Sequence, residues 1–508
     1  MGGSGAGVAT QTRSRQGEFF DRAMYLLDVQ GWPADQMRPD TGPVVAPAGA
    51  RLRLCETDPH DGRHLPPPGD PGVLLDTARF SLANSGNRTL LAPKRSWKVD
   101  LDAGDADGEV AGMSVLNLKA MYNDPSQMRE ALAWGLFGQA GVPASRHTYA
   151  KFGINRAYLG LFSVIEQVDR AFLKERFGRN SKGNLFKVYC GEIGPGTLQH
   201  RVGPDGDDSG RQYRGPDSDD PTYRLKSYSD APGADSYDDL ARFVRVVNGV
   251  DLPGGDDRFG TDAFAASARE VFNVDAFLRW AGINLLVGGW DNYFATPANY
   301  YLYNSGKAGG AGDVVADPYF TFIPWDYDNT FGIDYFGVRW QDTDLLDWPA
   351  NTAGYWRFNG GSGTSRLPLV QNLLRHADFR RYYLDHVEYL LDTAFNPAAI
   401  EAVTGADGSG GLWDRVSRAA YLESDTPYGR PFTERQWTND EVFHNGFAQY
   451  ELRHGNAFAL GITHYVRMRH DSARVQLERL RRTDPRGASG ATFPVSPEPL
   501  PGRARVDG

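Results

Sequence analysis

The sequence predicts an α+β fold, with a β-rich front part and a mainly helical back part. Before residue 190, short runs of branched and aromatic residues recur, as in ARFSLAN, RSWKVDL and TYAKFGI. After residue 236, long stretches such as HADFRRYYLDHVEYLLDTAF are typical of helices. The run NYYLYNSGKAGGAGDVVADPYFTFIPWD is typical of two strands joined by a Gly-rich loop. We therefore expect strands first, helices later, and a hairpin that carries acidic residues.

The 508 residues divide into four segments. Residues 1–16 and 483–508 are rich in small and polar residues and are predicted to be disordered. Residues 17–190 form the β-rich part with one helix. Residues 191–482 form the mainly helical part, which includes an acidic insertion at 191–235 that we expect to be a surface loop.

The helix of the front part has start and stop signals. Asp124 as N-cap with Pro125 in the next position predicts a start there. Gly141, followed by a proline two residues later, predicts the end. Apolar residues recur between them at helical spacing: Met128, Leu132, Leu136 and Phe137.

Composition narrows the class of protein. Lys and Arg number 54 against 64 Asp and Glu, which gives a net charge of −10 and disfavours nucleic acid as a partner. No run approaches the roughly 18 apolar residues that cross a bilayer, so no transmembrane segment is expected. The first residues lack the apolar stretch of a signal peptide, and the location in the cell stays open. Cys55 and Cys190 exclude a Cys-rich zinc site, and we favour two thiols over one disulfide.

The hairpin segment, 291–332, contains the most suggestive polar residues. Asp291 follows an apolar helix, and Asp326 and Asp328 follow the second strand. Asn299 comes just before the first strand. Phosphoryl transfer uses such parts: a carboxylate near the accepting hydroxyl, an amide oxygen, and a carboxylate on Mg²⁺. The alternative is that these acids merely cap turns and accept hydrogen bonds from backbone amides.

Two more charged residues complete a possible set. Lys98 alternates with Trp97 and Val99 on a predicted strand, and Glu166 follows the apolar run GLFSVI. Taken alone, Lys98 would face water, and Glu166 could either pair with a cation or begin a surface turn. Together with the aspartates they form the Lys–Glu–Asp–Asp set that a protein-kinase-like site requires. The chain has no GxSxG, HExxH or P-loop motif, which disfavours serine hydrolases, zinc proteases and P-loop NTPases.

Several blocks in order resemble the CotH (spore coat protein H-like) kinase family along most of residues 75–405. The most specific block is LNLKAMYNDPSQMREALAWGLFGQAGVPASRHTYAKFGINRAYLGLFSVIEQVDRAFLKERFG. The stretches GNLFKV, YRLKSYSD, GGWDNYFATPANYYLYN and FTFIPWDYDNTFG follow it. The resemblance implies a bilobal atypical protein-kinase-like fold that uses ATP and Mg²⁺ or Mn²⁺ to phosphorylate protein hydroxyls, with spore-coat or cell-surface proteins as candidate substrates.

The resemblance also implies roles for individual residues. Lys98 would hold the ATP phosphates and Glu166 would pair with Lys98. Asp291 would be the catalytic carboxylate and Asp326 a metal ligand. Two further residues, Asp328 and Asn299, would support the site, and either could supply the second metal ligand.

Two other functions fit the same residues. Kinase-like folds also host transfer of AMP or another group from ATP, and a pseudokinase could act as a binding module in coat assembly. Retention of the four charged positions disfavours the pseudokinase, since a binding module does not need them.

Overall fold

The structure is a computed structural model, and most of the chain is described by it. Residues 1–13 and 494–508, which belong to the two ends predicted to be disordered, lie outside the described residues. The described residues are 14–22, 24–33, 42–59, 72–86, 90, 94–103, 108–121, 123–215, 219–307, 314–334, 338–346, 367–425, 447–452, 455–483, 491 and 493.

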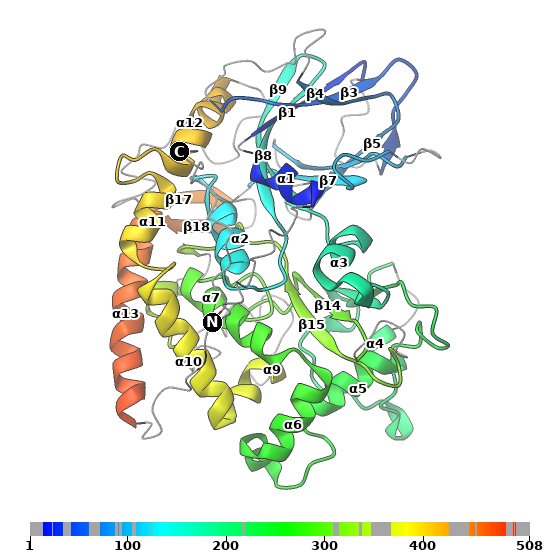
Figure 1. The fold of residues 1–508 in the computed structure, drawn as a ribbon, viewed down its shortest axis with the longest axis vertical. Coiled ribbons are helices and arrows are strands. Elements are labelled where there is room, and N and C mark those ends of the chain that lie inside the picture. Colours follow the sequence, from blue (N-terminus) through cyan, green and yellow to red (C-terminus); the bar gives the residue numbers. More distant parts are fainter. Residues whose placement is uncertain are drawn as a thin grey trace, which may run out of the picture.

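A curled nine-stranded sheet lies at one end of the molecule (Figure 1). Its strand order is β2-β5-β6-β7-β9-β8-β1-β3-β4. Strands β1 and β8 pair in parallel, and the other neighbours pair antiparallel. The strands are β1 (Tyr25–Gln30), β2 (Val44–Val45), β3 (Arg51–Glu56), β4 (Val73–Thr77), β5 (Ser81–Ser85), β6 (Ser96–Asp100), β7 (Val115–Lys119), β8 (His147–Ile154) and β9 (Ala157–Glu166).

A second, four-stranded antiparallel sheet has the order β13-β10-β14-β15. Its strands are β10 (Asn184–Val188), β13 (Tyr223–Ser227), β14 (Tyr300–Asn304) and β15 (Phe320–Pro324). Two smaller sheets join β11 (Cys190–Gly191) to β12 (Gly194–Pro195), and β18 (Gly455–Leu460) to β16 (Ile333–Asp334) and β17 (Phe447–Leu452).

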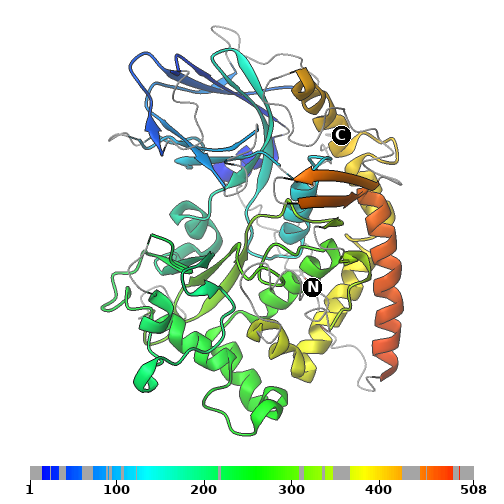
Figure 2. The same ribbon diagram turned by 180° about the vertical axis from the view of Figure 1, so that it is seen from behind.

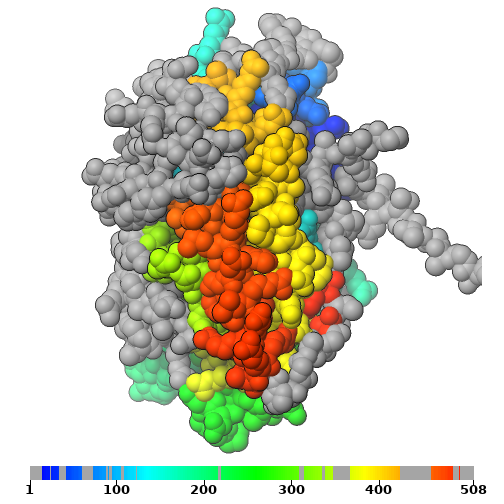
Figure 3. Space-filling model, turned by 90° about the vertical axis from the view of Figure 1, so that its left-hand side faces the viewer, coloured from blue at the N-terminus to red at the C-terminus, as the bar shows by residue number. Residues whose placement is uncertain are grey.

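Most helices lie at the end of the molecule opposite the nine-stranded sheet (Figure 1). Helix α13 packs against α10 and α11, and Figure 3 shows it as a ridge beside them. The helices are α1 (Arg15–Asp21), α2 (Arg129–Gln139), α3 (Arg170–Phe177), α4 (Arg211–Arg214), α5 (Asp238–Val247), α6 (Asp262–Val271), α7 (Val274–Val287), α9 (Pro368–Gln371), α10 (Ala377–Asp392), α11 (Pro397–Thr404), α12 (Gly411–Tyr421) and α13 (Ile462–Thr483). Short 3₁₀ helices occupy Gly178–Asn180, Pro204–Gly206, Gly255–Gly260, Trp340–Asp342, Leu373–Arg375 and Leu422–Asp425.

Two hydrophobic cores hold these layers together. The first, which we call the sheet core, lies within the curl of the nine-stranded sheet and includes Leu52, Val99 and Phe162. The second, the helix core, joins the four-stranded sheet to the helices and includes Trp280 and Phe322. Alternate residues of β9 enter different cores, since side chains on a strand point to opposite faces. Strand β9 therefore contributes to both cores.

The α+β fold class predicted from the sequence is confirmed. The three quoted strand segments overlap β5, β6 and β8. The predicted hairpin is the antiparallel pair β14–β15, in which Tyr300 lies opposite Pro324. The insertion at 191–235 is more regular than a plain loop, because it contains α4, β12 and β13.

The predicted start of α2 is wrong by about one turn. The helix begins at Arg129, because Gln127 has a φ of +58° and breaks the helical path after Asp124-Pro125. The Asp124 carboxylate accepts hydrogen bonds from the backbone N–H groups of Ser126 and Arg129 at 2.9 and 2.8 Å. Asp124 thus organises the turn that leads into the helix.

Helix α2 lies beside the β17–β18 hairpin (Figure 2). The guanidinium of Arg129 donates a 2.5 Å hydrogen bond to the carbonyl of Leu460 at the end of β18. Within the described part of the chain, no helix is long and apolar enough to span a membrane. Cys55 and Cys190 form no disulfide, as the sequence favours.

Candidate active site

Lys119 is the last residue of β7 and joins the nine-stranded sheet to the segment after β15. Its Nζ atom lies 2.7 Å from Oδ1 of Asp326, and the two side chains are 16% and 29% exposed. Burial alone would lower the pKa of Lys119, but the charges of Asp326 and Glu130 outweigh it and hold the pKa above its usual range. Lys119 is therefore a charged lysine that contacts a carboxylate from the other side of the site.

Glu130 in the first turn of α2 is the second acidic neighbour of Lys119. Its side chain is buried, and it shares a helix face with Trp134 and Phe137. Burial raises the pKa of Glu130 to about 7, against the opposing charge of Lys119. The backbone N–H of Tyr327 donates a 3.5 Å hydrogen bond to the Glu130 carboxylate. This bond links α2 to residues 326–328, which carry two aspartates and are here called the aspartate segment.

The aspartate segment leaves β15 through a strained residue. Asp326 has a φ of +65°, a conformation that non-glycine residues rarely adopt and that often marks functional sites. Burial raises the pKa of Asp328 well above its usual range, and the charges of Asp326 and Glu130 add to this effect. The chain thus holds two close carboxylates whose negative charges repel each other.

Asp291 is connected to the chain just after the aspartate segment by a hydrogen bond from Asn329. Thr296 Oγ1 donates a 3.0 Å hydrogen bond to Asp291 Oδ1, and Asn329 Nδ2 donates one of 3.2 Å to Oδ2. Asn123 Nδ2 in turn donates a 2.6 Å hydrogen bond to Asn329 Oδ1. These bonds fix the orientation of the Asp291 carboxylate relative to the segment that carries Asp326.

Asn299 is held close to Asp291 but contacts its backbone. Its Nδ2 donates a 2.9 Å hydrogen bond to the Asp291 carbonyl, and its φ is +54°. The structure therefore brings together four of the six residues selected from the sequence, namely Asp291, Asn299, Asp326 and Asp328.

Lys98 and Glu166 do not form the predicted ion pair. Glu166 lies opposite Leu116 on β7, and Leu116 lies opposite Val99 on β6, so Glu166 and Lys98 are on opposite faces of the sheet. Lys98 Nζ instead lies 3.7 Å from Asp100 Oδ2, and the Lys98 side chain is 43% exposed.

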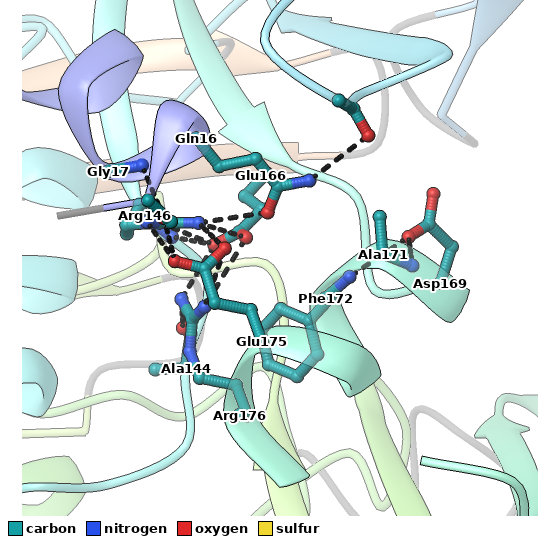
Figure 4. Close-up of polar contacts among 12 residues, drawn as sticks. Gln16, Gly17, Ala144, Arg146, Glu166, Asp169, Ala171, Phe172, Glu175 and Arg176 are labelled. Carbon is teal, nitrogen blue, oxygen red and sulfur yellow. Dashed lines mark hydrogen bonds and ion pairs between the residues drawn. The ribbon is translucent and has the colours of Figure 1, made fainter. Parts of the chain in front are cut away.

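Glu166 is held by two arginines (Figure 4). Its oxygens lie 2.7 Å from both Arg146 and Arg176, and its side chain is only 2% exposed. Arg146 also pairs with Glu175 at 2.6 Å and donates a 3.1 Å hydrogen bond to Gln16. The network joins α1, the residue before β8, the end of β9, and α3, so it connects elements of the fold.

Sequence reasoning missed Lys119 and Glu130, although both lie in the block LNLKAMYNDPSQMREALAWGLF. One signal was present for Glu130. An acid that precedes Ala133, Trp134 and Phe137 by three, four and seven residues lies on an apolar helix face, and a buried acid needs a partner. No comparable signal separates Lys119 from Lys98 within their strands.

The donor set fits a divalent cation of the Mg²⁺ type. Mg²⁺ prefers oxygen ligands and is usually held by one or two carboxylates together with substrate phosphates. Asp326 and Asp328 supply two such carboxylates, and their repulsion would be relieved by a cation. Among the described residues, no group of three or more His, Cys, Asp or Glu side chains forms a complete metal cage, so other ligands would be needed.

Comparison with known proteins shows the family of this chain. The model of the CotH kinase protein family matches residues 82–404, which include Lys119, Glu130, Asp291 and Asp326. The chain belongs to the CotH kinase family. The resemblance stated from the sequence is thereby confirmed.

Curated relatives of this CotH family member are distant. Invasin CotH3 of Rhizopus delemar is 22% identical over 380 residues, which cover 73% of this chain and 55% of that protein. Invasin CotH2 of the same organism is 23% identical over 330 residues, 63% of this chain and 48% of that protein. Inner spore coat protein H of Bacillus subtilis is 26% identical over 286 residues, 56% of this chain and 64% of that protein. The chain thus spans between about half and two thirds of these relatives.

Proposed function

We propose that this chain is a protein kinase that transfers the γ-phosphoryl group of ATP to Ser or Thr hydroxyls. One observation carries the proposal: Lys119 on β7 contacts Asp326 after β15, next to the buried Glu130. A Lys–Glu pair and a metal-binding Asp are the parts that kinase-like phosphoryl transfer combines. In this proposal the nine-stranded sheet and the helical end are the two lobes of a kinase-like fold.

The proposal gives the lysine and glutamate roles to Lys119 and Glu130 in place of Lys98 and Glu166. Lys119 lies 2.7 Å from the Asp326 carboxylate, and its ammonium is a compact charge suited to phosphate oxygens. Glu130 would hold Lys119 in place through its charge. The Lys119–Asp326 contact would loosen as phosphates approach, which frees the carboxylate to act as a ligand.

The aspartates have separate roles in the proposal. Asp326 and Asp328 would hold Mg²⁺ or Mn²⁺, with Asn299 as a supporting residue. The bound cation would neutralise negative charge on the phosphates. Asp291 would accept a hydrogen bond from the incoming hydroxyl, because Thr296 and Asn329 fix its carboxylate from other directions.

The names of the relatives suggest the kind of acceptor. One is an inner spore coat protein and two are invasins. We propose that the acceptor of this chain is likewise a protein of a coat or cell surface.

Titration calorimetry with ATP and Mg²⁺ tests the assignment of the aspartates. The parent protein is expected to bind ATP only with the metal. Asp326→Ala should lose this metal-dependent binding, whereas Asp291→Asn should keep it, because Asp291 is assigned to the hydroxyl. Equal affinity in the parent and in Asp326→Ala would contradict the assignment, and loss of binding in Asp291→Asn would place that residue in the nucleotide site.

A further inference from the structure

Lys187 on β10 lies among three aromatic rings at one end of the four-stranded sheet. Tyr301 is on β14, and Tyr189 and Trp325 directly follow β10 and β15. Lys187 is opposite Tyr301. Its Nζ atom lies 4.9 Å from the ring centre of Tyr189, 5.4 Å from that of Trp325 and 5.6 Å from that of Tyr301. Ring faces attract a cation, but they do not neutralise its charge.

Lys187 differs in its partners from three other lysines of the structure. Lys94, Lys119 and Lys307 each lie within 2.7 Å of a carboxylate oxygen. Lys187 is half-buried and has no carboxylate partner among the described residues. A partly desolvated ammonium that lacks a counter-ion attracts an anion more strongly than a solvated one does.

The hydroxyl of Tyr301 is a second polar group beside it. Tyr301 is 2% exposed, and its hydroxyl makes no hydrogen bond of normal geometry with the described residues. Burial raises the pKa of Tyr301, while the nearby charge of Lys187 opposes the rise. A buried hydroxyl without a hydrogen bond of normal geometry is costly, and the polar side chains that act on it include those of Lys187 and Gln167.

This cluster adjoins the candidate active site. Trp325 immediately precedes Asp326, and its ring lies 5.5 Å from Nζ of Lys119 and 5.4 Å from Nζ of Lys187. The charge of Lys119 also acts on Tyr189. Two lysines from different sheets therefore flank the same indole ring. Of these two lysines, only Lys119 is paired with a carboxylate.

We propose that Lys187, held by Tyr189, Tyr301 and Trp325, is a second phosphate-binding residue of the site. It would contact a phosphate group of a polyphosphate chain other than the one held by Lys119. The aromatic rings and the Tyr301 hydroxyl position the ammonium, and the lysine alone touches the ligand. This inference rests on the proposed function, because it takes the polyphosphate to be that of a nucleotide.

Calorimetry of the full chain with Mg²⁺ and either inorganic tripolyphosphate or ATP tests this subsite. Lys187→Met keeps most of the apolar stem and removes the charge. It should weaken the binding of both probes about tenfold, as expected for one lost charge-assisted hydrogen bond. Lys187→Arg should restore most of the affinity.

Lys226→Met is the matched control. Lys226 lies on β13 of the same sheet, 5.2 Å from the ring centre of Tyr228, and is exposed. This variant should bind both probes like the parent, and the melting temperatures of the ligand-free variants check that each one folds.

The outcomes separate the two proposals. ATP binding by the parent with unchanged affinity in Lys187→Met would overturn the subsite and leave the kinase proposal standing. Lys187-dependent binding of tripolyphosphate without binding of ATP would support the subsite and contradict the proposal that its ligand is a nucleotide. A parent that binds neither probe would contradict both.

Discussion

Lys98 and Lys119 point to the same face of the nine-stranded sheet. Lys98 lies opposite Asn117, which shares a face with Lys119 two residues further along β7. Only Lys119 contacts Asp326, a residue 207 positions later in the chain. A strand pattern shows which face a lysine takes, but the partner on that face depends on the packing of a distant segment.

Replacement of each lysine by methionine separates their roles. Lys119→Met should lower phosphoryl transfer by about 10²-fold to 10³-fold, the range for loss of one donor that stabilises developing charge. Lys98→Met should leave the rate close to that of the parent, since Lys98 is half-exposed and paired with Asp100. Steady-state rates with an acceptor protein measure the effect of each variant. A larger loss of rate in Lys98→Met than in Lys119→Met would support the original prediction that Lys98 holds the ATP phosphates.

At the scale of the element, ion pairs between Glu166 and two arginines hold the end of β9 in place. Glu166 is the last residue of β9, Arg176 is on α3, and Arg146 immediately precedes β8. The sequence showed a glutamate after an apolar run, which is equally compatible with a catalytic and a structural partner. The strand register favours the structural partner, because it turns Glu166 away from Lys98.

Glu166→Ala should therefore affect stability more than nucleotide binding. Removal of one partner from a buried ion pair costs roughly 3–5 kcal/mol, and we expect about 3 kcal/mol because both arginines stay partly exposed. Urea denaturation measures the loss. The affinity for ATP with Mg²⁺ should equal that of the parent, and Glu175→Ala, which removes a more exposed acid, should cost less.

A weaker affinity for ATP in Glu166→Ala, with unchanged stability, would contradict the structural role. It would then support the original prediction that Glu166 acts in the nucleotide site.

At the scale of the whole molecule, order along the chain was easier to predict than contacts across it. Strand and helix patterns, together with the ordered family blocks, predicted an α+β chain and placed the hairpin that carries Asp326. Asp291 was selected because it lies in the same stretch of sequence, and the structure places it near that segment. Lys119 and Glu130 were not selected, because the contacts that bring them to Asp326 join the nine-stranded sheet, α2 and the segment after β15, and no local pattern contains such contacts.

Buried histidines on both sides of the molecule make its stability depend on pH. Burial lowers the pKa of His147 on β8 and of His386 on α10 to about 3. In the unfolded chain the imidazole pKa is near 6.5, so below that pH only the unfolded state takes up these protons. Stability should be constant above pH 6.5 on this account and should fall by about 1.4 kcal/mol per pH unit for each histidine below it.

His386→Leu removes one of these groups from the helix core. The unfolding free energy of the variant relative to the parent should rise as pH falls from 6.5 to 5, by about 1.4 kcal/mol per unit once the unfolded imidazole is charged. Urea denaturation at pH 7.5, 6.5 and 5.5 measures the difference. A difference that does not change with pH would mean that His386 is not held neutral in the folded protein.

Transfer of label from ATP tests the central claim most directly. The parent chain, Asp291→Asn and Asp326→Ala are incubated with Mg²⁺ or Mn²⁺, an acceptor protein, and ATP labelled at either the γ- or the α-phosphate. We predict that the parent alone transfers the γ-label, with losses of at least about 10²-fold in both variants. Transfer of the α-label would instead show adenylyl transfer. Equal γ-transfer by all three proteins, or no transfer of either label by the parent, would contradict the assignment of this site to phosphoryl transfer.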